Sequence, residues 1–302
     1  GYTGVGFSHI SVNPSLSIIY KLNYAWRFTV HASYKERYGE MTDLYDRPYQ
    51  TDYRNSVWNC GILPVYRQQL YSVYGEYKNT AREFFATVNL THNREWYNRI
   101  YEQRIENGQV QRVSLPLSNH GSGYTVKSTL SKGFYDLGLK TSLMALLNIS
   151  KAEQISGGQR LPYQYRLMRL EPKVIWTPNR HWETSYQTDI RYGGSKIGER
   201  TRLAPLWNVT QQVQFSYIFS PIEASLSVDH YHNDVNEDQS VNAVFADFSV
   251  SWKSRRWQIT ATATNLFDKR TYAYTRYASL ESYTSWVRIR PREFLVAIRY
   301  RL

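Results

Sequence analysis

The feature that most constrains this chain is a period of two in its hydrophobic residues, which recurs along most of the 302 residues. In segment 182–192, for example, Trp182, Tyr186 and Ile190 alternate with polar residues. Alternation of this kind places apolar side chains on one face of a β-strand and polar side chains on the other. The polar faces are rich in Ser, Thr, Gln, Arg and Lys, which suits contact with water and not a second packed core.

The length of these segments points to a membrane. They run over about 9–15 residues, whereas strands of soluble proteins average about 5–6 and membrane-spanning strands need about 9–11. Short turn signals alternate with longer segments at 39–65, 98–122, 153–161, 194–205, 234–240 and 271–287. Short turns at one rim and long loops at the other are typical of bacterial outer-membrane barrels. The predicted fold is therefore all-β, a transmembrane antiparallel up-and-down β-barrel.

Counting the alternating segments predicts about 13 strands, with an extra hairpin within 98–122. The predicted strands are 14–22, 25–38, 66–78, 82–97, 122–133, 137–153, 162–177, 181–193, 206–219, 222–233, 240–253, 256–269 and 288–302. An odd meander cannot close with antiparallel neighbours, and open sheet edges are not viable in lipid. Either the count is wrong by one, or residues 1–302 form one barrel domain that is part of a larger barrel. Residues 1–13 resemble the end of an outer loop and favour the second alternative.

Composition fits a barrel and argues against other classes. No run of about 18 apolar residues exists that could span a bilayer as a helix. The chain has 27 Tyr and nine Trp, many of them near strand ends, where interfacial girdles lie. The net charge of +12 is spread over the whole pattern, which favours a solvated lumen and loops over a nucleic-acid partner. A single cysteine excludes an internal disulfide and a Cys-rich zinc site, and we expect no cofactor.

The last 40 or so residues carry motifs of a known family. Asn265-Leu266-Phe267-Asp268 follows a strand, and Arg290-Pro291-Arg292-Glu293-Phe294 precedes the final one. This arrangement resembles the C-terminal end of TonB-dependent outer-membrane receptors, closest to the type of Bacteroidetes-like bacteria. Such barrels usually end in an aromatic residue, whereas this chain ends in Leu302.

The resemblance implies the C-terminal portion of a 22-stranded barrel in the bacterial outer membrane. An N-terminal plug, a TonB box and about nine strands would then precede residue 1, and TonB would couple energy through the plug. Outer-membrane lipid and lipopolysaccharide are further expected partners, together with a surface lipoprotein. The predicted function is plug-gated, TonB-dependent uptake of a nutrient such as a metal chelate or a glycan.

Three groups of residues are candidates for specific roles. We predict that one face of the last strand contacts lipid and forms the assembly signal, namely Phe294, Val296, Ile298, Tyr300 and Leu302. We predict ligand contact by aromatic residues of two loops, namely Tyr45, Tyr49, Tyr53, Trp58, Tyr272, Tyr274, Tyr277, Tyr283 and Trp286. His230 and His232 share a strand face and are the best candidates for metal ligands, although no third ligand is set by local spacing.

Two alternative functions stay open. One is a barrel without a plug that acts as a passive channel or as a scaffold for a partner chain. The other is an outer-membrane hydrolase, although no Gly-x-Ser-x-Gly or His-Glu-x-x-His motif is present. We therefore expect no catalytic residue and no enzyme.

Overall fold

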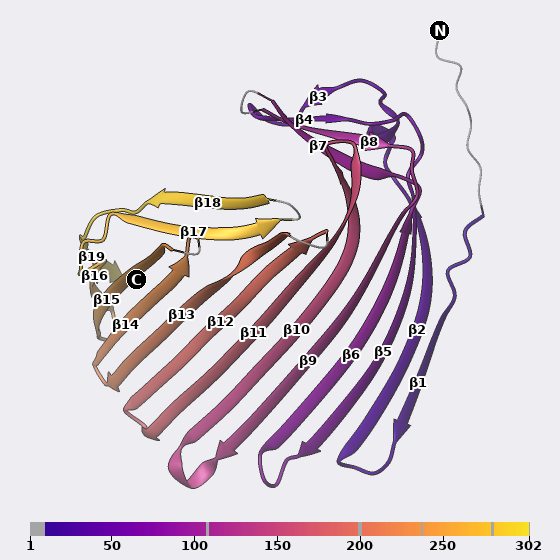
Figure 1. Cartoon of the computed structure of the whole chain (residues 1–302). Helices are drawn as coiled ribbons and strands as arrows, with labels where there is room; N and C mark the ends of the chain where they lie inside the picture. Colours follow the sequence, from indigo (N-terminus) through magenta and orange to yellow (C-terminus); the bar gives the residue numbers. More distant parts are fainter. Residues whose placement is uncertain (1–9, 107–108, 199–200, 237, 279–280, 302) are drawn as a thin grey trace.

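The fold is seen in a computed structural model that describes residues 10–106, 109–198, 201–236, 238–278 and 281–301. Thirteen strands follow one another as antiparallel neighbours and form one curved sheet (Figure 1). They are β1 (Ser15–Lys21), β2 (Trp26–Tyr38), β5 (Val65–Asn79), β6 (Phe84–Tyr97), β9 (Asn119–Phe134), β10 (Leu139–Ser156), β11 (Gln159–Asn179), β12 (Trp182–Ile197), β13 (Thr201–Phe219), β14 (Ile222–Asp234), β15 (Ser240–Lys253), β16 (Trp257–Thr264) and β19 (Glu293–Tyr300). The predicted count and order of these strands are confirmed.

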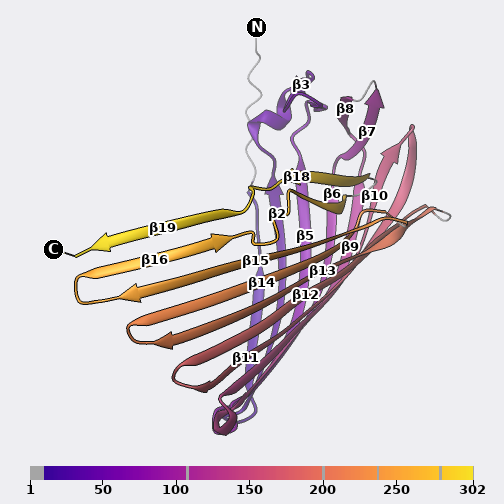
Figure 2. The same ribbon diagram turned by 90° about the vertical axis from the view of Figure 1, so that its left-hand side faces the viewer.

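The two ends of the sheet differ. One end carries only short connections, among them the turn closed by η2 (Tyr135–Leu137), and we name it the turn end. The other end, the loop end, carries two further units (Figure 2). The first unit contains η1 (Met41–Leu44), β3 (Tyr49–Gln50), β4 (Asn55–Trp58), β7 (Ile100–Glu106) and β8 (Gln109–Leu115). The second unit is the hairpin of β17 (Thr271–Ala278) and β18 (Glu281–Arg288).

The first loop-end unit extends the sheet to 17 strands. β4 pairs in parallel with β8, and β7 joins the end of β10 through Glu102 and Ile155. The β7–β8 hairpin is the extra hairpin that the sequence predicts within 98–122, and its existence is confirmed.

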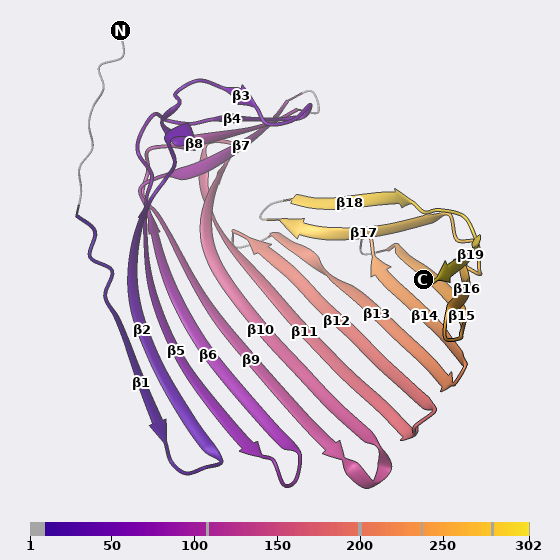
Figure 3. The same cartoon turned by 180° about the vertical axis from the view of Figure 1, so that it is seen from behind.

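The sheet remains open, with β1 and β19 at its edges (Figure 3). Because thirteen strands alternate in direction, these two edge strands both run from the loop end toward the turn end. They therefore cannot pair with each other in antiparallel fashion, as the odd strand count predicts. The described residues include no helix long and apolar enough to cross a bilayer.

Three predicted loops are wrong. Segments 153–161 and 194–205 are mostly strand, because β10–β11 and β12–β13 continue as long hairpins at the loop end. Segment 271–287 forms the β17–β18 hairpin, and β16 ends at Thr264, five residues before the predicted 269. In the three segments, backbone pairing continues wherever a partner strand is in register, even after the apolar alternation has ended. β16 ends early because the next residue, Asn265, leaves the extended conformation and adopts a positive φ of 50°.

Candidate functional site

The outer face of the sheet is apolar in rows that run from strand to strand. Ile298 lies opposite Ile259, and Leu226 lies opposite Phe248, all on the same face. Ile298, Ile259 and Phe248 are exposed in the isolated chain, and Ile298 keeps 65% of its surface, whereas Leu226 is half-buried. A continuous exposed apolar face on a strongly curved sheet is the surface that a membrane barrel turns to lipid.

Aromatic pairs border this face at both ends. Toward the turn end, Trp182 and Tyr217 have ring centroids 4.6 Å apart, and similar pairs form along the same rim. Toward the loop end, His92 stacks on Tyr124 at 4.3 Å. Two aromatic belts that bound an apolar band are typical of membrane barrels, whose amphipathic rings sit at the lipid–water boundary.

The proposed assembly residues of the last strand share this outer face. Phe294, Val296, Ile298 and Tyr300 alternate on β19, and Phe294 lies opposite Ala263 of β16. Leu302 lies outside the described residues. Their contact with lipid and their role in assembly stay predictions.

The inner, concave face carries the candidate site. A cavity of about 500 Å³ lies between the inner face of β11–β14 and the hairpin β17–β18. Its wall is polar and aromatic, with Arg169, Asp189 and Arg191 on one side and Tyr272 and Tyr274 on the other. Guanidinium groups, phenols and amides together offer many hydrogen bonds to a solute in a water-filled lumen.

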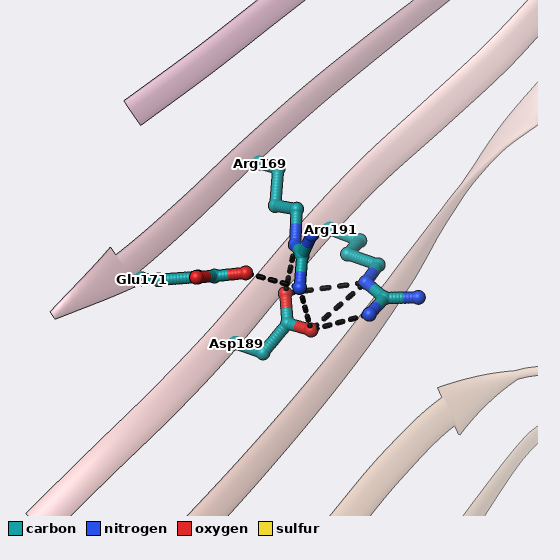
Figure 4. A network of polar contacts seen from close by, with 4 residues as sticks. All are labelled: Arg169, Glu171, Asp189 and Arg191. Atoms are coloured by element: carbon teal, nitrogen blue, oxygen red, sulfur yellow. Dashed lines mark hydrogen bonds and ion pairs between the residues drawn. The ribbon is translucent and has the colours of Figure 1, made fainter. Parts of the chain in front are cut away.

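A network of charges fixes the two arginines of this cavity (Figure 4). Arg169 and Arg191 are direct cross-strand neighbours, an arrangement in which like charges repel. Asp189 relieves the repulsion because it accepts two bonds from Arg169, at 2.9 and 3.0 Å, and further bonds from Arg191, the shortest at 2.5 Å. Glu171 forms a second ion pair with Arg169. Half of the Arg191 side chain stays exposed, so this guanidinium can still contact a solute.

The hairpin β17–β18 is anchored to the barrel wall. The buried Asn233 of β14 donates hydrogen bonds to the Tyr272 hydroxyl at 3.0 Å and to the Ala273 carbonyl at 3.2 Å. The Thr275 hydroxyl bonds the Val235 carbonyl at 3.1 Å. These bonds draw the hairpin over the concave face, as Figure 1 shows. The two tyrosines of the cavity are thereby held in place.

The Asn265-Leu266-Phe267-Asp268 motif has a structural role at the base of this hairpin. Asn265 adopts a positive φ of 50°, and its amide donates to the carbonyls of Lys269, at 2.8 Å, and Arg290, at 2.9 Å. The Asp268 carboxylate accepts the backbone N–H of Arg292 at 3.0 Å. The motif therefore ties together the two chain segments that enter and leave the hairpin.

A second cavity, of about 740 Å³, lies at the loop end between the β3–β4–β7–β8 unit and the inner face of the neighbouring strands. In its wall, two cations approach the Tyr101 ring, with the Arg112 guanidinium 3.7 Å and the Arg99 guanidinium 5.0 Å from its centroid. Arg99 also forms an ion pair with Asp43 at 2.8 Å. Cation–π contacts and an ion pair hold this unit in a defined position.

A tyrosine pair at the loop end shares one carboxylate. The hydroxyls of Tyr66 and Tyr97 donate to Glu95 at 3.1 and 2.9 Å, and the two rings are in contact. Burial and the adjacent Glu95 charge raise the pKa of Tyr66 to about 12 and raise the pKa of Tyr97 as well. Both phenols therefore stay protonated donors over the whole physiological pH range.

The loop aromatics that the sequence singles out divide into two groups. Tyr45 packs edge-on against Tyr49 at 6.1 Å, Trp58 donates to Asp46 at 3.3 Å, and Tyr53 is 80% exposed, all in the first loop-end unit. Tyr272 and Tyr274 face the inner cavity, whereas Trp286 is 68% exposed.

The side chains of Tyr277 and Tyr283 are outside the described part, and ligand contact by any of these aromatics stays a prediction. Sequence reasoning did not select Arg169, Asp189 and Arg191 as a site, because their only signal is charge at period two on polar strand faces.

His230 and His232 lie on the outer face of β14, and no third ligand joins them. His232 contacts Asn242 at 2.9 Å and Asp234 at 3.3 Å. No group of three His, Cys, Asp or Glu residues with metal-binding geometry occurs within the described residues. In the same part of the chain, histidine hydrogen bonds involve carbonyl, amide and arginine groups, and none involves a serine hydroxyl.

No family model and no curated protein matches the chain. Solved structures do match. The FrpB iron transporter of Neisseria meningitidis is 8% identical, with a TM-score of 0.50, over 89% of this chain and 44% of that one. The ferric yersiniabactin uptake receptor FyuA of Yersinia pestis is 8% identical, with a TM-score of 0.45, over 96% and 50%. The ferric preacinetobactin receptor BauA of Acinetobacter baumannii is 7% identical, with a TM-score of 0.49, over 83% and 44%.

The similarity to FrpB, together with the curved antiparallel sheet, establishes the fold class. The fold is that of an outer-membrane β-barrel. The chain spans half or less of the length of these three neighbours. The loop end then corresponds to the outer side of the membrane, and the turn end to the periplasmic side.

Proposed function

We propose that this chain is the C-terminal barrel portion of a TonB-dependent transporter that takes up a solute through its lumen. The observation that carries the proposal is the cavity of about 500 Å³ on the inner face, roofed by the β17–β18 hairpin. A barrel wall with hydrogen-bonding groups beneath an inward-folded outer hairpin suits capture of a solute before passage. Assignment to the Bacteroidetes-like type of these receptors belongs to the same proposal.

The open sheet supports a larger closed barrel. The edge strands β1 and β19 run in the same direction, so antiparallel closure takes an odd number of further strands. Nine strands would complete the 22 that the family resemblance implies. Closure is needed because unpaired backbone groups at a sheet edge are costly in lipid. A plug from the same N-terminal part would gate the lumen and connect it to TonB.

The chemistry of the cavity favours a solute with acidic or hydroxyl groups. The exposed half of Arg191 offers charge-assisted hydrogen bonds, and Tyr272 and Tyr274 offer flat surfaces for stacking. A metal chelate and a glycan both carry such groups. Outer-membrane lipopolysaccharide and a surface lipoprotein are the further partners that we propose.

An uptake measurement tests this function. Cells that produce the complete gene product would be given labelled ferric chelates and oligosaccharides, with and without a protonophore. We expect one class to accumulate, the protonophore to abolish accumulation, and Arg191→Gln to reduce it. Lys127→Gln is the matched control, because Lys127 also lies on the inner face but not in the cavity.

The alternatives predict other results. A channel without a plug would let proteoliposomes that contain the complete gene product swell in sugar solutions, and uptake would not respond to the protonophore. A scaffold for a partner chain would show neither uptake nor swelling. Either result would contradict the proposed function.

A further inference from the structure

A row of polar side chains crosses the outer face near the loop end and spans six consecutive strands of the meander. The cross-strand register places its members directly beside one another, and we name them the outer-rim row. They are Gln69 (β5), Arg94 (β6), Ser122 (β9), Lys151 (β10), Gln164 (β11) and Lys196 (β12).

The row begins where the apolar outer face ends. On β5, β6 and β9, the next outward residues toward the turn end are Tyr71, His92 and Tyr124, whose rings stack in sequence at 6.4 and 4.3 Å. These rings belong to the aromatic belt that marks the lipid–water boundary. The outer-rim row therefore lies at headgroup depth, on the outer leaflet side.

Three cations of the row line one groove. Arg94, Lys151 and Lys196 bound a groove of about 490 Å³, together with Ser122 and Gln164. They lie on alternate strands, and strands are about 4.8 Å apart, so neighbouring cations are spaced by about 10 Å. Among the described residues, none of the three has a carboxylate within 4.0 Å.

Two acids line the groove, Glu95 and Glu153. The Glu95 carboxylate accepts hydrogen bonds from the hydroxyls of Tyr66 and Tyr97. Glu153 forms an ion pair with Arg160 at 3.0 Å. The Arg94 Nε atom donates to His92 Nε2 at 3.3 Å, which leaves its terminal nitrogens available. The three cations of the groove outnumber Glu95, so the groove is cationic, with hydroxyl and amide groups between the charges.

We propose that the outer-rim row binds the phosphate groups of a phosphorylated glycolipid of the outer leaflet. The phosphates would neutralise the unpaired cations, and Ser122 and Gln164 would hydrogen-bond the sugar. The acyl chains would lie on the apolar outer face below the belt. Binding here rests on the lipopolysaccharide partner proposed above. The site lies on the opposite face of the sheet from the lumen cavity, so its test is separate from that of solute uptake.

Lipid binding by the complete protein in nonionic detergent tests this inference. The probe is diphosphorylated lipid A, measured by native mass spectrometry, and the test variant is R94Q/K151Q/K196Q. We expect binding about a hundredfold weaker, since each basic residue beside an anionic lipid surface contributes about fivefold. Wild-type protein should discriminate by a similar factor against lipid A without phosphates.

The matched control is K127Q/K140Q/K173Q, which removes the same charge from the inner face of β9, β10 and β11. Its lipid binding should stay close to that of the wild type. Equal binding of lipid A with and without phosphates by the wild-type protein would overturn the proposal. So would unchanged binding by the folded outer-rim variant, or displacement of the lipid by an equal concentration of inorganic phosphate.

Discussion

The membrane band and the loop end of this sheet are built on different physical principles. In the band, apolar residues of the outer face such as Phe248 and Ile298 are exposed in the isolated chain. At the loop end, Ile100, Val113 and Ile155 are almost fully buried. The band therefore relies on lipid and on backbone pairing, whereas the loop end relies on side-chain packing like that of a soluble domain.

The difference matters for function because the loop end contains or borders both cavities. Packing and hydrogen bonds there hold the two extra units against the strand ends, as with Asn233 and the β17–β18 hairpin. The band can tolerate exchange among apolar residues, but the loop end depends on particular contacts. The predictions below test this contrast, from the largest expected effect to the smallest.

The largest effect is expected at the packed loop end. Ile100 has no exposed surface, so Ile100→Ala should cost about 2–5 kcal/mol through lost burial and a cavity. The loss should be local and should appear in hydrogen exchange as faster opening of β7 and β8. Ile19→Ala, at a residue that is 62% exposed, is the control. Equal effects at the two positions would remove the distinction between the regions.

In the band, the face of a strand should decide the effect of a charge. Leu226→Arg on the outer face should reduce the free energy of unfolding in lipid by about 2–4 kcal/mol. Ser227→Arg, on the inner face of the same strand, should change it far less. On the last strand, Ile298→Arg on the outer face should likewise reduce the free energy of unfolding more than Ala297→Arg on the inner face. If the two faces respond alike, the lipid-facing assignment is wrong.

Within the lumen, the Asp189 carboxylate should contribute to the free energy of unfolding because it separates two arginines. Asp189→Asn leaves Arg169 and Arg191 beside each other without the shared carboxylate. It should reduce the free energy of unfolding by about 1–3 kcal/mol. Added salt should narrow the difference from the wild type, because screening weakens the repulsion between the arginines. Denaturant titrations at low and high salt would measure this. A deficit that does not depend on salt would argue for a packing effect instead.

The smallest expected effect concerns pH at the loop end. The folded-state pKa of Tyr66, about 12, lies above its ordinary value of 10.0, so the protonated phenol is favoured in the fold. The resulting stability is fully present below about pH 10 and is lost as the pH rises through about 12. The difference in ultraviolet absorbance between the wild type and Tyr66→Phe would report this ionisation. Glu95→Gln should lower the pKa, because the charge and the hydrogen bond of Glu95 both raise it.

Much of the fold could be predicted because strand alternation is a local signal. The thirteen strands, their order and the hairpin within 98–122 all follow from residues near in sequence. The predicted loops 153–161 and 194–205 were wrong because the polar ends of β10–β13 give no apolar alternation and are still paired. A bulge between Gly193 and Ser195 also shifts the register there, and the sequence gives no sign of it.

The candidate site was less predictable. Tyr272 and Tyr274 were selected as loop aromatics, and the structure places them at the lumen cavity, although their contact with a ligand stays a prediction. Arg169 and Arg191 were not selected as a pair, because alternation assigns each to a face but does not say which residue lies opposite. The outer-rim row depends in the same way on register across six strands.

The sequence by itself determined which residues share a face, how many strands cross the membrane and that an odd number of them cannot close antiparallel. Those properties depend on the period-two geometry of single strands and on counting. The tertiary structure alone decided that Arg169 and Arg191 share Asp189, that β17–β18 folds over the lumen, and that Arg94, Lys151 and Lys196 line one groove. Those properties depend on the offset between strands, which backbone pairing leaves free and which side-chain contacts must select.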